Sequence, residues 1–287
     1  MNIAIVGLGL IGGSLGRTII NRTQDKVFAF DLSGEAMKVG KLLGAYHEEL
    51  SDENIKDIDI LFLSLYPRSL EGALEKYCPL LKDGALVVDC CGNKRKIVES
   101  MKTFAEKFPH LQFISSHPMA GREFSGVKHS TATLFDKASM ILVPVNASLK
   151  NISLLKEFSK EIGFGSVVIT SATEHDRIIA FTSQLAHLVS SSYIKSDTAD
   201  SFMGFSAGSF RDMTRVARLS PQMWAELTVD NSDFLVKELD SIIKNLSEYK
   251  KALENKDIEK MKSLLADGNQ RKLLSEKNRR IFNNENQ

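Results

Sequence analysis

A glycine-dense turn near the amino terminus has the residue types and the spacing that bind a pyrophosphate. Its residues are Gly7, Leu8, Gly9, Leu10, Ile11 and Gly12, which fit the pattern G-x-G-x-x-G. The first glycine permits a tight turn, the second leaves room for the pyrophosphate, and the third lets a helix pack closely on a strand. Such a pattern can also mark a simple bend. Here an apolar strand-like run precedes it and a helical pattern follows it, which favours a dinucleotide site.

An acidic residue fits the same site. Asp31 ends the second predicted strand, 19 residues after Gly12. At that position a carboxylate can accept hydrogen bonds from both hydroxyls of a ribose. It would also repel a 2′-phosphate, and no basic residue follows it directly. The sequence therefore favours NAD over NADP as the cofactor.

The stretch Ser115–Glu123, with the sequence SSHPMAGRE, supplies a candidate base. It follows a predicted strand, and parallel sheets bind ligands at the carboxyl ends of their strands. His117 can take up a proton near neutral pH while hydride leaves the same carbon, as the oxidation of an alcohol requires. An isolated histidine more often only caps a loop, but the strand end and the neighbouring Pro118 favour a catalytic role. Gly121, Arg122 and Glu123 follow closely, although either charged side chain can be no more than a rim charge.

Two residues further along could contact a substrate. His187 lies on a predicted helix beside the small and polar side chains of Ala180, Gln184 and Ser191. For a helical histidine, burial with one hydrogen bond or simple exposure is the more common situation. Arg215 offers the planar fork that binds a carboxylate through two hydrogen bonds. The alternative for this arginine is a solvated ion pair with Asp212, three residues before it.

The elements that position these residues alternate in type up to about residue 170. The predicted strands are 2–6, 26–31, 59–65, 85–90, 111–116, 139–145 and 166–170. Segments of helical length lie between most of them and include 11–21, 68–81, 94–107 and 149–162. This alternation predicts an α/β fold of the Rossmann type, with a doubly wound, mainly parallel sheet. Leu65, Pro67 and Gly92 follow strands at their carboxyl ends, so they are expected to contact the cofactor.

After residue 170 only helical patterns remain. The predicted helices are 174–196, 206–218, 221–252 and 257–280, and only the polar ending 283–287 is expected to be disordered. We therefore predict a dinucleotide-binding domain over residues 1–170 and an all-helical substrate and dimerisation domain over 171–287. Because the helices leave large apolar faces, a homodimer formed through the helical domain is expected.

Composition excludes several classes of partner. The 37 Lys and Arg residues nearly balance the 36 Asp and Glu residues, so no overall charge draws the chain to nucleic acid or to an anionic membrane. No apolar run approaches the roughly 20 residues that cross a bilayer. Cys78, Cys90 and Cys91 form no metal-binding or disulfide spacing, which suits free thiols in the cytoplasm, and no metal site is predicted.

Four segments together resemble the prephenate dehydrogenase family. They are GLGLIGGSLG, SHPMAGRE followed by Ser125 and Gly126, TEHDRIIAFTSQLAHLV, and SFRDMTRVARLSPQMWAEL, and they span about residues 1–230 in the order of the family. The resemblance implies NAD-dependent oxidative decarboxylation of prephenate to 4-hydroxyphenylpyruvate in tyrosine biosynthesis, or of the related arogenate. It also implies that His117 accepts the proton of the ring hydroxyl, that His187 contacts the substrate, and that Arg215 binds a carboxylate.

Two positions depart from that family, and two other functions stay open. Many members have a serine where this chain has Gly92 and a second histidine where it has Gln184. A β-hydroxyacid dehydrogenase would share the domain order, but it would need a catalytic lysine where this helix has His187 and no lysine before Lys195. An NAD-sensing regulator would need a basic recognition helix, for which 272–280 is the candidate. A solvated helix face explains that segment more simply.

Overall fold

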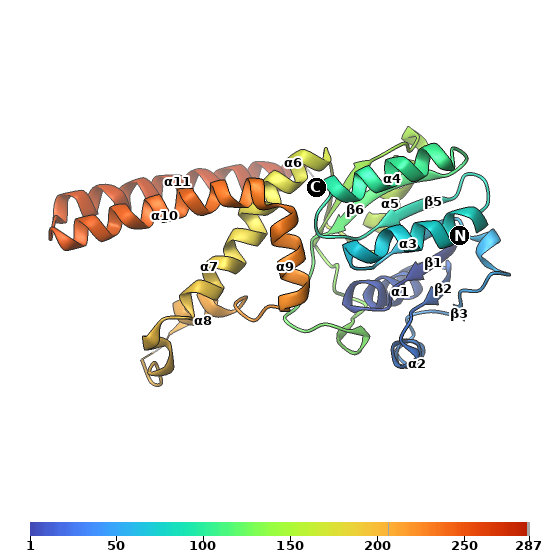
Figure 1. The fold of residues 1–287 in the computed structure, drawn as a ribbon, viewed down its shortest axis with the longest axis horizontal. Coiled ribbons are helices and arrows are strands. Elements are labelled where there is room, and N and C mark those ends of the chain that lie inside the picture. The colour runs from blue at the N-terminus through green and yellow to red at the C-terminus, as the bar shows by residue number, and fades with distance from the viewer. Residues whose placement is uncertain (206, 286–287) are drawn as a thin grey trace. The chain divides into compact units, whose positions relative to one another are not determined.

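The computed structural model describes residues 1–205 and 207–285, and the chain divides into two compact units, Met1–Asn231 and Ser232–Gln287. The first unit contains the sheet and the helices that directly follow it (Figure 1). The predicted change of architecture at residue 171 therefore lies inside the first unit. As a domain boundary, it stays a prediction.

An eight-stranded sheet forms the centre of the first unit. Its strands are β1 (Asn2–Val6), β2 (Lys26–Phe30), β3 (Glu48–Glu49), β4 (Ile60–Leu63), β5 (Leu86–Asp89), β6 (Gln112–Pro118), β7 (Ser139–Pro144) and β8 (Ser166–Ile169). They lie in the order β3-β2-β1-β4-β5-β6-β7-β8, and the described pairings are parallel except for β6 with β7. The predicted Rossmann-type sheet is confirmed, and the two-residue β3 adds an edge that the sequence pattern did not reveal.

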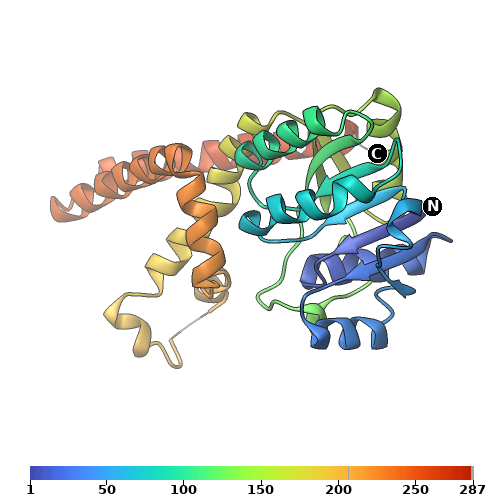
Figure 2. The same cartoon turned by 45° about the vertical axis from the view of Figure 1, so that its right-hand side comes forward.

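Helices cover both faces of this sheet, because successive side chains of each buried strand point to opposite sides. One face carries α1 (Leu10–Arg22), α2 (Gly34–Leu42) and α5 (Leu149–Glu161), and the other carries α3 (Pro67–Tyr77) and α4 (Arg95–Lys107) (Figures 1 and 2). Ile3 and Ile5 of β1 pack into the first core, whereas Ala4 and Val6 of the same strand pack into the second. Short 3-10 turns at Ile55–Asp57, Cys78–Leu80, Val127–His129 and Asp197–Asp200 complete the connections.

The strand order reverses between β1 and β4. Val6 at the end of β1 pairs with Phe30 of β2 on one side and with Leu63 of β4 on the other. Chain connections leave this point in opposite directions, and doubly wound sheets bind ligands at such a point, outside the carboxyl ends of the strands. β5 and β6 end at the same edge, with Asp89 opposite Ser115.

The helices after the sheet are shorter than the sequence pattern predicts. They are α6 (Ala172–Ile179), a π-helical segment (Ala180–Leu185), α7 (Ala186–Tyr193), α8 (Gly208–Thr214) and α9 (Pro221–Asp230). The predicted helix 174–196 is thus interrupted by the π segment. The start of predicted helix 206–218 lies outside the described residues, and that helix ends at Thr214. Predicted helix 221–252 is broken at Asn231, whose backbone leaves the helical region and whose buried side chain bonds to neighbouring elements.

The second unit is a hairpin of two long helices. α10 (Ser232–Glu254) and α11 (Ile258–Glu285) run side by side in both views (Figures 1 and 2), and Tyr249 of α10 donates a hydrogen bond to the carbonyl of Leu264 at 3.3 Å. Helix α11 continues to Glu285, so the predicted disorder from residue 283 is wrong as far as that residue, and 286–287 lie outside the described residues.

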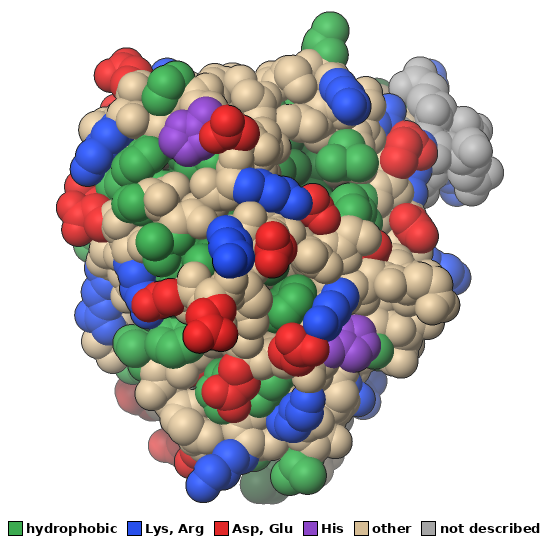
Figure 3. All heavy atoms as spheres, turned by 90° about the vertical axis from the view of Figure 1, so that its right-hand side faces the viewer, with side chains coloured by type: hydrophobic (Ala, Val, Ile, Leu, Met, Phe, Trp, Pro, Cys, Tyr) green, Lys and Arg blue, Asp and Glu red, His purple; other side chains and the backbone are tan. Residues whose placement is uncertain are grey.

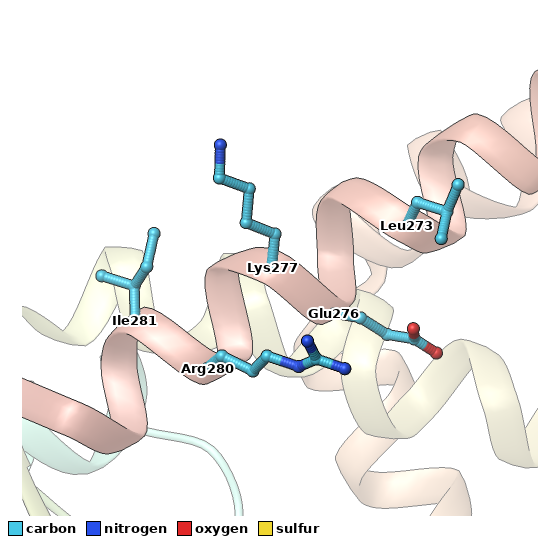
Figure 4. A pocket seen from close by; sticks show the side chains of 5 residues that line it. All are labelled: Leu273, Glu276, Lys277, Arg280 and Ile281. Carbon is cyan, nitrogen blue, oxygen red and sulfur yellow. The ribbon is translucent and has the colours of Figure 1, made fainter.

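Both helices of the hairpin leave large apolar side chains in solvent. The exposed set includes Val236, Ile243, Leu246, Leu253, Leu265, Leu273 and Leu274. A shallow hollow of about 220 Å³ on α11 is lined by Leu273, Glu276, Lys277, Arg280 and Ile281 (Figure 4). It contains none of the predicted site residues, and its single-helix lining offers no enclosed binding site.

Surface charge and hydropathy agree with the sequence composition. On the face shown in Figure 3, acidic and basic side chains are interspersed with apolar ones, and neither sign dominates. None of the described helices combines the length and the apolar character that a bilayer crossing requires.

Candidate active site

The glycine turn has the geometry of a dinucleotide cradle. Gly7 has a φ of +95°, and a Cβ there would lie 2.4 Å from the carbonyl oxygen of Ser64. A Cβ on Gly12 would lie 1.9 Å from the carbonyl oxygen of Gly7, so the turn and α1 can approach only without side chains. At Gly9, by contrast, nothing lies within 4 Å of the position that a Cβ would take. The second glycine therefore borders open space, next to the unpaired N–H groups that begin α1.

Asp31 lies directly beside this turn. One carboxylate oxygen accepts the N–H of Leu8 at 2.7 Å and the other accepts the N–H of Ser33 at 2.8 Å. These two bonds fix the carboxylate at the end of β2, and each oxygen keeps a further lone pair for a ribose hydroxyl. The turn, the start of α1 and Asp31 therefore fit NAD. Contact of Leu8, Leu10 and Ile11 with the cofactor stays a prediction.

Three further predicted cofactor residues occupy the same sheet edge. Leu65 follows β4, and its side chain would lie 2.9 Å from a Cβ on Gly7. Pro67 begins α3, where its missing N–H costs nothing. Gly92 follows β5, and a Cβ there would meet Leu227 of α9 at 3.1 Å, so this glycine lies against the helices after the sheet. Contact of these residues with the cofactor stays a prediction.

The two cysteines after β5 are packing residues. Burial raises the pKa of Cys90 to about 11 and raises that of the buried Cys91 well above its ordinary value. Cys91 Sγ lies 3.5 Å from the carbonyl oxygen of Leu65, which helps to join the loops after β4 and β5. Neither thiol has the thiolate character that a reactive cysteine needs.

His117 lies at the end of β6 and meets a second histidine that the sequence reasoning missed. Its Nδ1 lies 2.9 Å from Nε2 of His175 on α6, and the ring centroids are 5.1 Å apart. Burial, the facing His175 and the nearby charge of Lys94 hold the pKa of His117 well below its ordinary value. His117 is therefore neutral near pH 7, as a proton acceptor must be.

Asp176 orients this histidine pair. Its Oδ1 lies 2.7 Å from Nδ1 of His175, and it also accepts the backbone N–H groups of Lys94 at 2.7 Å and Arg95 at 3.0 Å. Burial alone would raise the pKa of Asp176, but these hydrogen bonds hold it below its ordinary value. The pKa of His175 is lowered chiefly by burial, so a neutral His175 faces an ionised Asp176.

These contacts determine which ring nitrogens carry protons. An ionised carboxylate only accepts, so Nδ1 of His175 must donate to Asp176. Nε2 of the neutral His175 is then an acceptor, which requires Nδ1 of His117 to donate to it. The remaining nitrogen of His117, Nε2, keeps its lone pair. The structure thus prepares Nε2 of His117 to take up a proton.

A buried ion pair lies beneath the pair of histidines. The side chain of Lys94 is fully buried, and its Nζ donates to Asp89 Oδ1 at 2.6 Å and to the carbonyl of Ser116 at 2.5 Å. Asp89 also accepts the N–H of Ser116 at 3.3 Å. Both charges are satisfied by hydrogen bonds, which a buried pair requires. Together they hold the backbone immediately before His117.

A sequence signal for His175 and Asp176 was available. The residues at positions 175, 176 and 179 of α6 and at position 180, which begins the π segment, are all buried, at the i, i+4 spacing of one helix face. Two adjacent polar residues on an inward face must find partners, which marks them as site candidates. Lys94 gave no such signal, because a lysine at the start of a helix ordinarily lies in solvent.

His187 is the second residue of α7, two positions after the end of the π segment. Its Nδ1 donates to the carbonyl of Ser183 at 2.8 Å, and its ring packs on that of Trp224 with centroids 4.1 Å apart. In a regular α-helix, twelve residues would set His187 about 120° around the axis from His175. An i→i+5 turn takes up about one extra residue, which reduces the offset to about 20°. The π segment therefore brings both histidines to one side of the helix.

Arg215 contacts the loop after β6. Its guanidinium lies 3.4 Å from Glu123, and this exposed pair replaces the pairing with Asp212 that the sequence offered as an alternative. Arg122 of the same loop donates to the carbonyl of His129 at 3.3 Å, and a Cβ on Gly121 would meet no atom within 4 Å. The structure thus joins Arg215 to the loop of His117. A direct contact of Gly121, Arg122 or Glu123 with substrate stays a prediction.

Comparisons with known proteins identify the family of this chain. The family model described as "Prephenate dehydrogenase, nucleotide-binding domain" matches residues 15–169, and that described as "Prephenate dehydrogenase, dimerization domain" matches residues 171–267. The chain belongs to the prephenate dehydrogenase family. It is an oxidoreductase of this family with an NAD-binding domain, and the separate β-hydroxyacid dehydrogenase alternative is set aside.

Individual relatives cover most of the chain. A cyclohexadienyl dehydrogenase of Zymomonas mobilis is 30% identical over 267 residues, which cover 89% of each protein. A prephenate dehydrogenase of Bacillus subtilis is 28% identical over 90% of this chain and 72% of the relative. The crystal structure of prephenate dehydrogenase from Aquifex aeolicus, in complex with hydroxyphenyl propionate and NAD+, superposes with a TM-score of 0.79 at 25% identity, over 96% of this chain and 98% of that one.

Proposed function

We propose that this chain catalyses the NAD-dependent oxidative decarboxylation of prephenate to 4-hydroxyphenylpyruvate. The observation that carries the proposal is the chain Asp176–His175–His117, which leaves a neutral imidazole with its Nε2 lone pair available at the ligand-binding edge of the sheet. That edge also carries the glycine turn and Asp31, so the proton acceptor and the cofactor cradle lie at the same edge of the sheet.

The chain's own residues account for the proton and the substrate's charges. Bound NAD+ supplies the hydride acceptor for the ring carbon that bears the hydroxyl. Nε2 of His117 takes the hydroxyl proton as that carbon becomes a carbonyl. The bond from the ring to its carboxylate then breaks and releases carbon dioxide, and its electron pair passes through the ring to the carbonyl oxygen. That oxygen takes the proton back from His117 to become the phenol hydroxyl of the aromatic product. The imidazolium that forms on His117 donates through His175 to the Asp176 carboxylate, which stabilises the positive charge.

Substrate orientation is assigned to the helices after the sheet. Prephenate carries two carboxylates, and the guanidinium of Arg215 can bind one of them bidentately. His187, held by Ser183 and Trp224, orients the substrate. Gly121, Arg122 and Glu123 form the loop between the base and Arg215, and we assign them to the wall of the substrate site.

Arogenate is the second candidate substrate. It shares the ring and differs in carrying an amino group where prephenate has a keto group. The relative from Zymomonas mobilis is named a cyclohexadienyl dehydrogenase, a name that specifies neither prephenate nor arogenate, so we retain both as candidate substrates. The proposed proton transfer acts on the ring hydroxyl, so it applies equally to either compound.

A homodimer through the helical domain accompanies this proposal. The match to a dimerisation domain and the exposed apolar side chains of α10 and α11 support it. Sedimentation equilibrium should give twice the mass of the chain, and a monomer at micromolar concentration would contradict the dimer. A cytoplasmic location stays a prediction.

The decisive experiment offers prephenate and arogenate separately to the purified protein with NAD+ or NADP+, and follows the absorbance of the reduced nicotinamide. We expect turnover of prephenate with NAD+. His117→Asn should abolish turnover and leave NADH binding unchanged. Absence of turnover with either substrate would refute the proposal, and NADH binding without any turnover would favour the regulator.

A further inference from the structure

Three buried amide side chains join the helices after the sheet to the loop after β5. They are Asn93, which precedes α4, Gln184 in the π segment, and Asn231 between α9 and α10, and we call them the amide circuit. Gln184 donates to Asn93 Oδ1 at 2.9 Å and to the carbonyl of Leu227 at 3.1 Å. Asn231 donates to Gln184 Oε1 and to the carbonyl of Asp176, both at 2.8 Å.

The amide circuit uses its hydrogen-bonding groups almost completely. Both N–H bonds of Gln184 have acceptors, and its oxygen accepts from Asn231. Asn93 donates to the carbonyl of Leu227 at 2.8 Å, and Asn231 Oδ1 accepts from Arg95 at 2.9 Å. A satisfied buried network favours one arrangement of its elements, because any other arrangement leaves buried polar groups unpaired.

This circuit touches both halves of the candidate site. On one side, the circuit reaches Asp176, the residue that holds His175 against His117. Asn93 precedes Lys94, whose N–H donates to the Asp176 carboxylate, and Asn231 donates to the Asp176 carbonyl. On the other side, Gln184 lies three residues before His187. Leu227, whose carbonyl the circuit binds, lies three residues after Trp224, the packing partner of His187.

We propose that Gln184 is a positioning residue for the dehydrogenase reaction, which sets His187 and its packing partner Trp224 relative to the base His117. The inference rests on the proposed function. Gln184 itself is buried and its side chain is bonded to other residues of the circuit, so we assign its effect to the amide circuit and not to contact with a reacting atom.

Two substitutions at this position make the test. Gln184→Leu removes every polar bond of the side chain, and we expect kcat/KM to fall by about ten- to a hundredfold, with a rise in KM, because small misplacements of site groups have effects of this size. NADH binding should stay unchanged, since the cradle lies on β1 and α1. Gln270→Leu, the same change at an exposed position of α11, is the matched control.

Gln184→Glu gives a signature that a merely structural role would lack. When protonated, its carboxyl can still donate one hydrogen bond to Asn93 or Leu227. When ionised, this carboxylate faces Asn93 Oδ1 and the carbonyl oxygen of Leu227 and has no proton to donate to either of them. Burial raises the pKa of such a carboxyl, and the negative charge of Asp176 raises this pKa further. The Arg95 guanidinium, which is bonded to Asn231, and any positive charge on His187 act in the opposite direction. The kcat/KM of this variant should therefore fall reversibly as the pH rises through one added ionisation, which wild type and Gln184→Leu lack.

A binding measurement separates this inference from the proposed function. Calorimetry with hydroxyphenylpropionate and NAD+ should show affinity about tenfold weaker for Gln184→Leu than for wild type. If wild type turns over neither substrate, the proposed function fails while this binding difference still supports the inference. Kinetics and binding of Gln184→Leu within twofold of wild type would overturn the inference. If that variant fails to fold, the pH profile of Gln184→Glu decides: the added ionisation supports the inference and its absence overturns it.

Discussion

Replacement of Asp176 by asparagine should remove the proton-accepting lone pair of His117, although the two side chains are joined only through His175. Asp176 presents two oxygens to N–H donors, one to His175 and the backbone of Lys94, the other to the backbone and side chain of Arg95. An asparagine must place its NH2 group at one of these two positions. An NH2 group facing Arg95 would lose two acceptor contacts, because both groups of Arg95 can only donate. An NH2 group at the other position would lose only the bond from the Lys94 N–H, because His175 can become an acceptor by moving its proton to Nε2. We therefore expect the NH2 group to face His175.

That change reverses the proton order of the histidine pair. With its proton on Nε2, His175 donates to Nδ1 of His117, and His117 then carries its own proton on Nε2. The nitrogen that should accept the substrate proton is occupied. Loss of a positioned general base lowers rates by about 10²- to 10⁴-fold, which is about 3 to 5 kcal/mol in the activation barrier. We expect kcat to fall within this range and NADH affinity to stay unchanged.

Steady-state kinetics and nitrogen-15 spectra of the histidine rings measure the two parts of this prediction. The spectra should show Nδ1–H on His117 in the wild-type protein and Nε2–H in Asp176→Asn. Asp230→Asn, which alters a carboxylate paired with the exposed Lys96, is the matched control. A kcat within tenfold of wild type, or an unchanged proton position on His117 in the folded variant, would refute the reasoning.

Three further predictions follow from the site. Arg215→Ala should raise the KM for substrate by about ten- to a hundredfold, which is the loss expected for a charged hydrogen bond. The control Arg211→Ala, which changes an exposed neighbour, should leave KM unchanged. Equal effects of the two substitutions would remove Arg215 from the site. Asp31→Ala should weaken the binding of NAD+ and reduce the preference for NAD+ over NADP+ about tenfold or more. The preference is the ratio of kcat/KM with NAD+ to kcat/KM with NADP+, and Glu35→Ala is the control. An unchanged ratio would contradict the cofactor assignment. The pKa of His117 is lowered from 6.5, so the acid limb of kcat/KM should lie well below pH 6.5. Because the unfolded chain protonates this ring at higher pH than the folded chain, the free energy of unfolding should decrease as the pH falls below 6.5. Thermal melts of His117→Asn should show a smaller decrease in this free energy than those of wild type. An identical decrease would contradict the neutral buried ring.

The sheet was predictable because its strands are continuous apolar runs separated by helical patterns. Buried parallel strands require such runs on both faces, and turn residues mark their ends. The glycine turn and Asp31 were found by the same local logic. Only β3 was missed, since two exposed glutamates carry no strand pattern.

The helices after the sheet were predictable in type but not in their breaks. Periodicity assumes 3.6 residues per turn, so it cannot reveal that the segment 180–185 follows a wider turn. The break at Asn231 depends on bonds to Asp176 and Gln184, residues 55 and 47 positions earlier. Contacts at this sequence separation leave no trace in a local pattern.

The start of α4 explains how the base and its support come to depend on each other. Helix N-termini are usually capped by Ser, Thr, Asp or Asn, and α4 has Lys94 at that position, with no side-chain cap of its own. Asp176 of α6 supplies the missing cap, because its carboxylate accepts the N–H groups of Lys94 and Arg95. A negative charge is also favoured there by the helix dipole. The same carboxylate holds His175 against His117, so the docking of α6 that completes helix α4 is also what gives His117 its working proton arrangement.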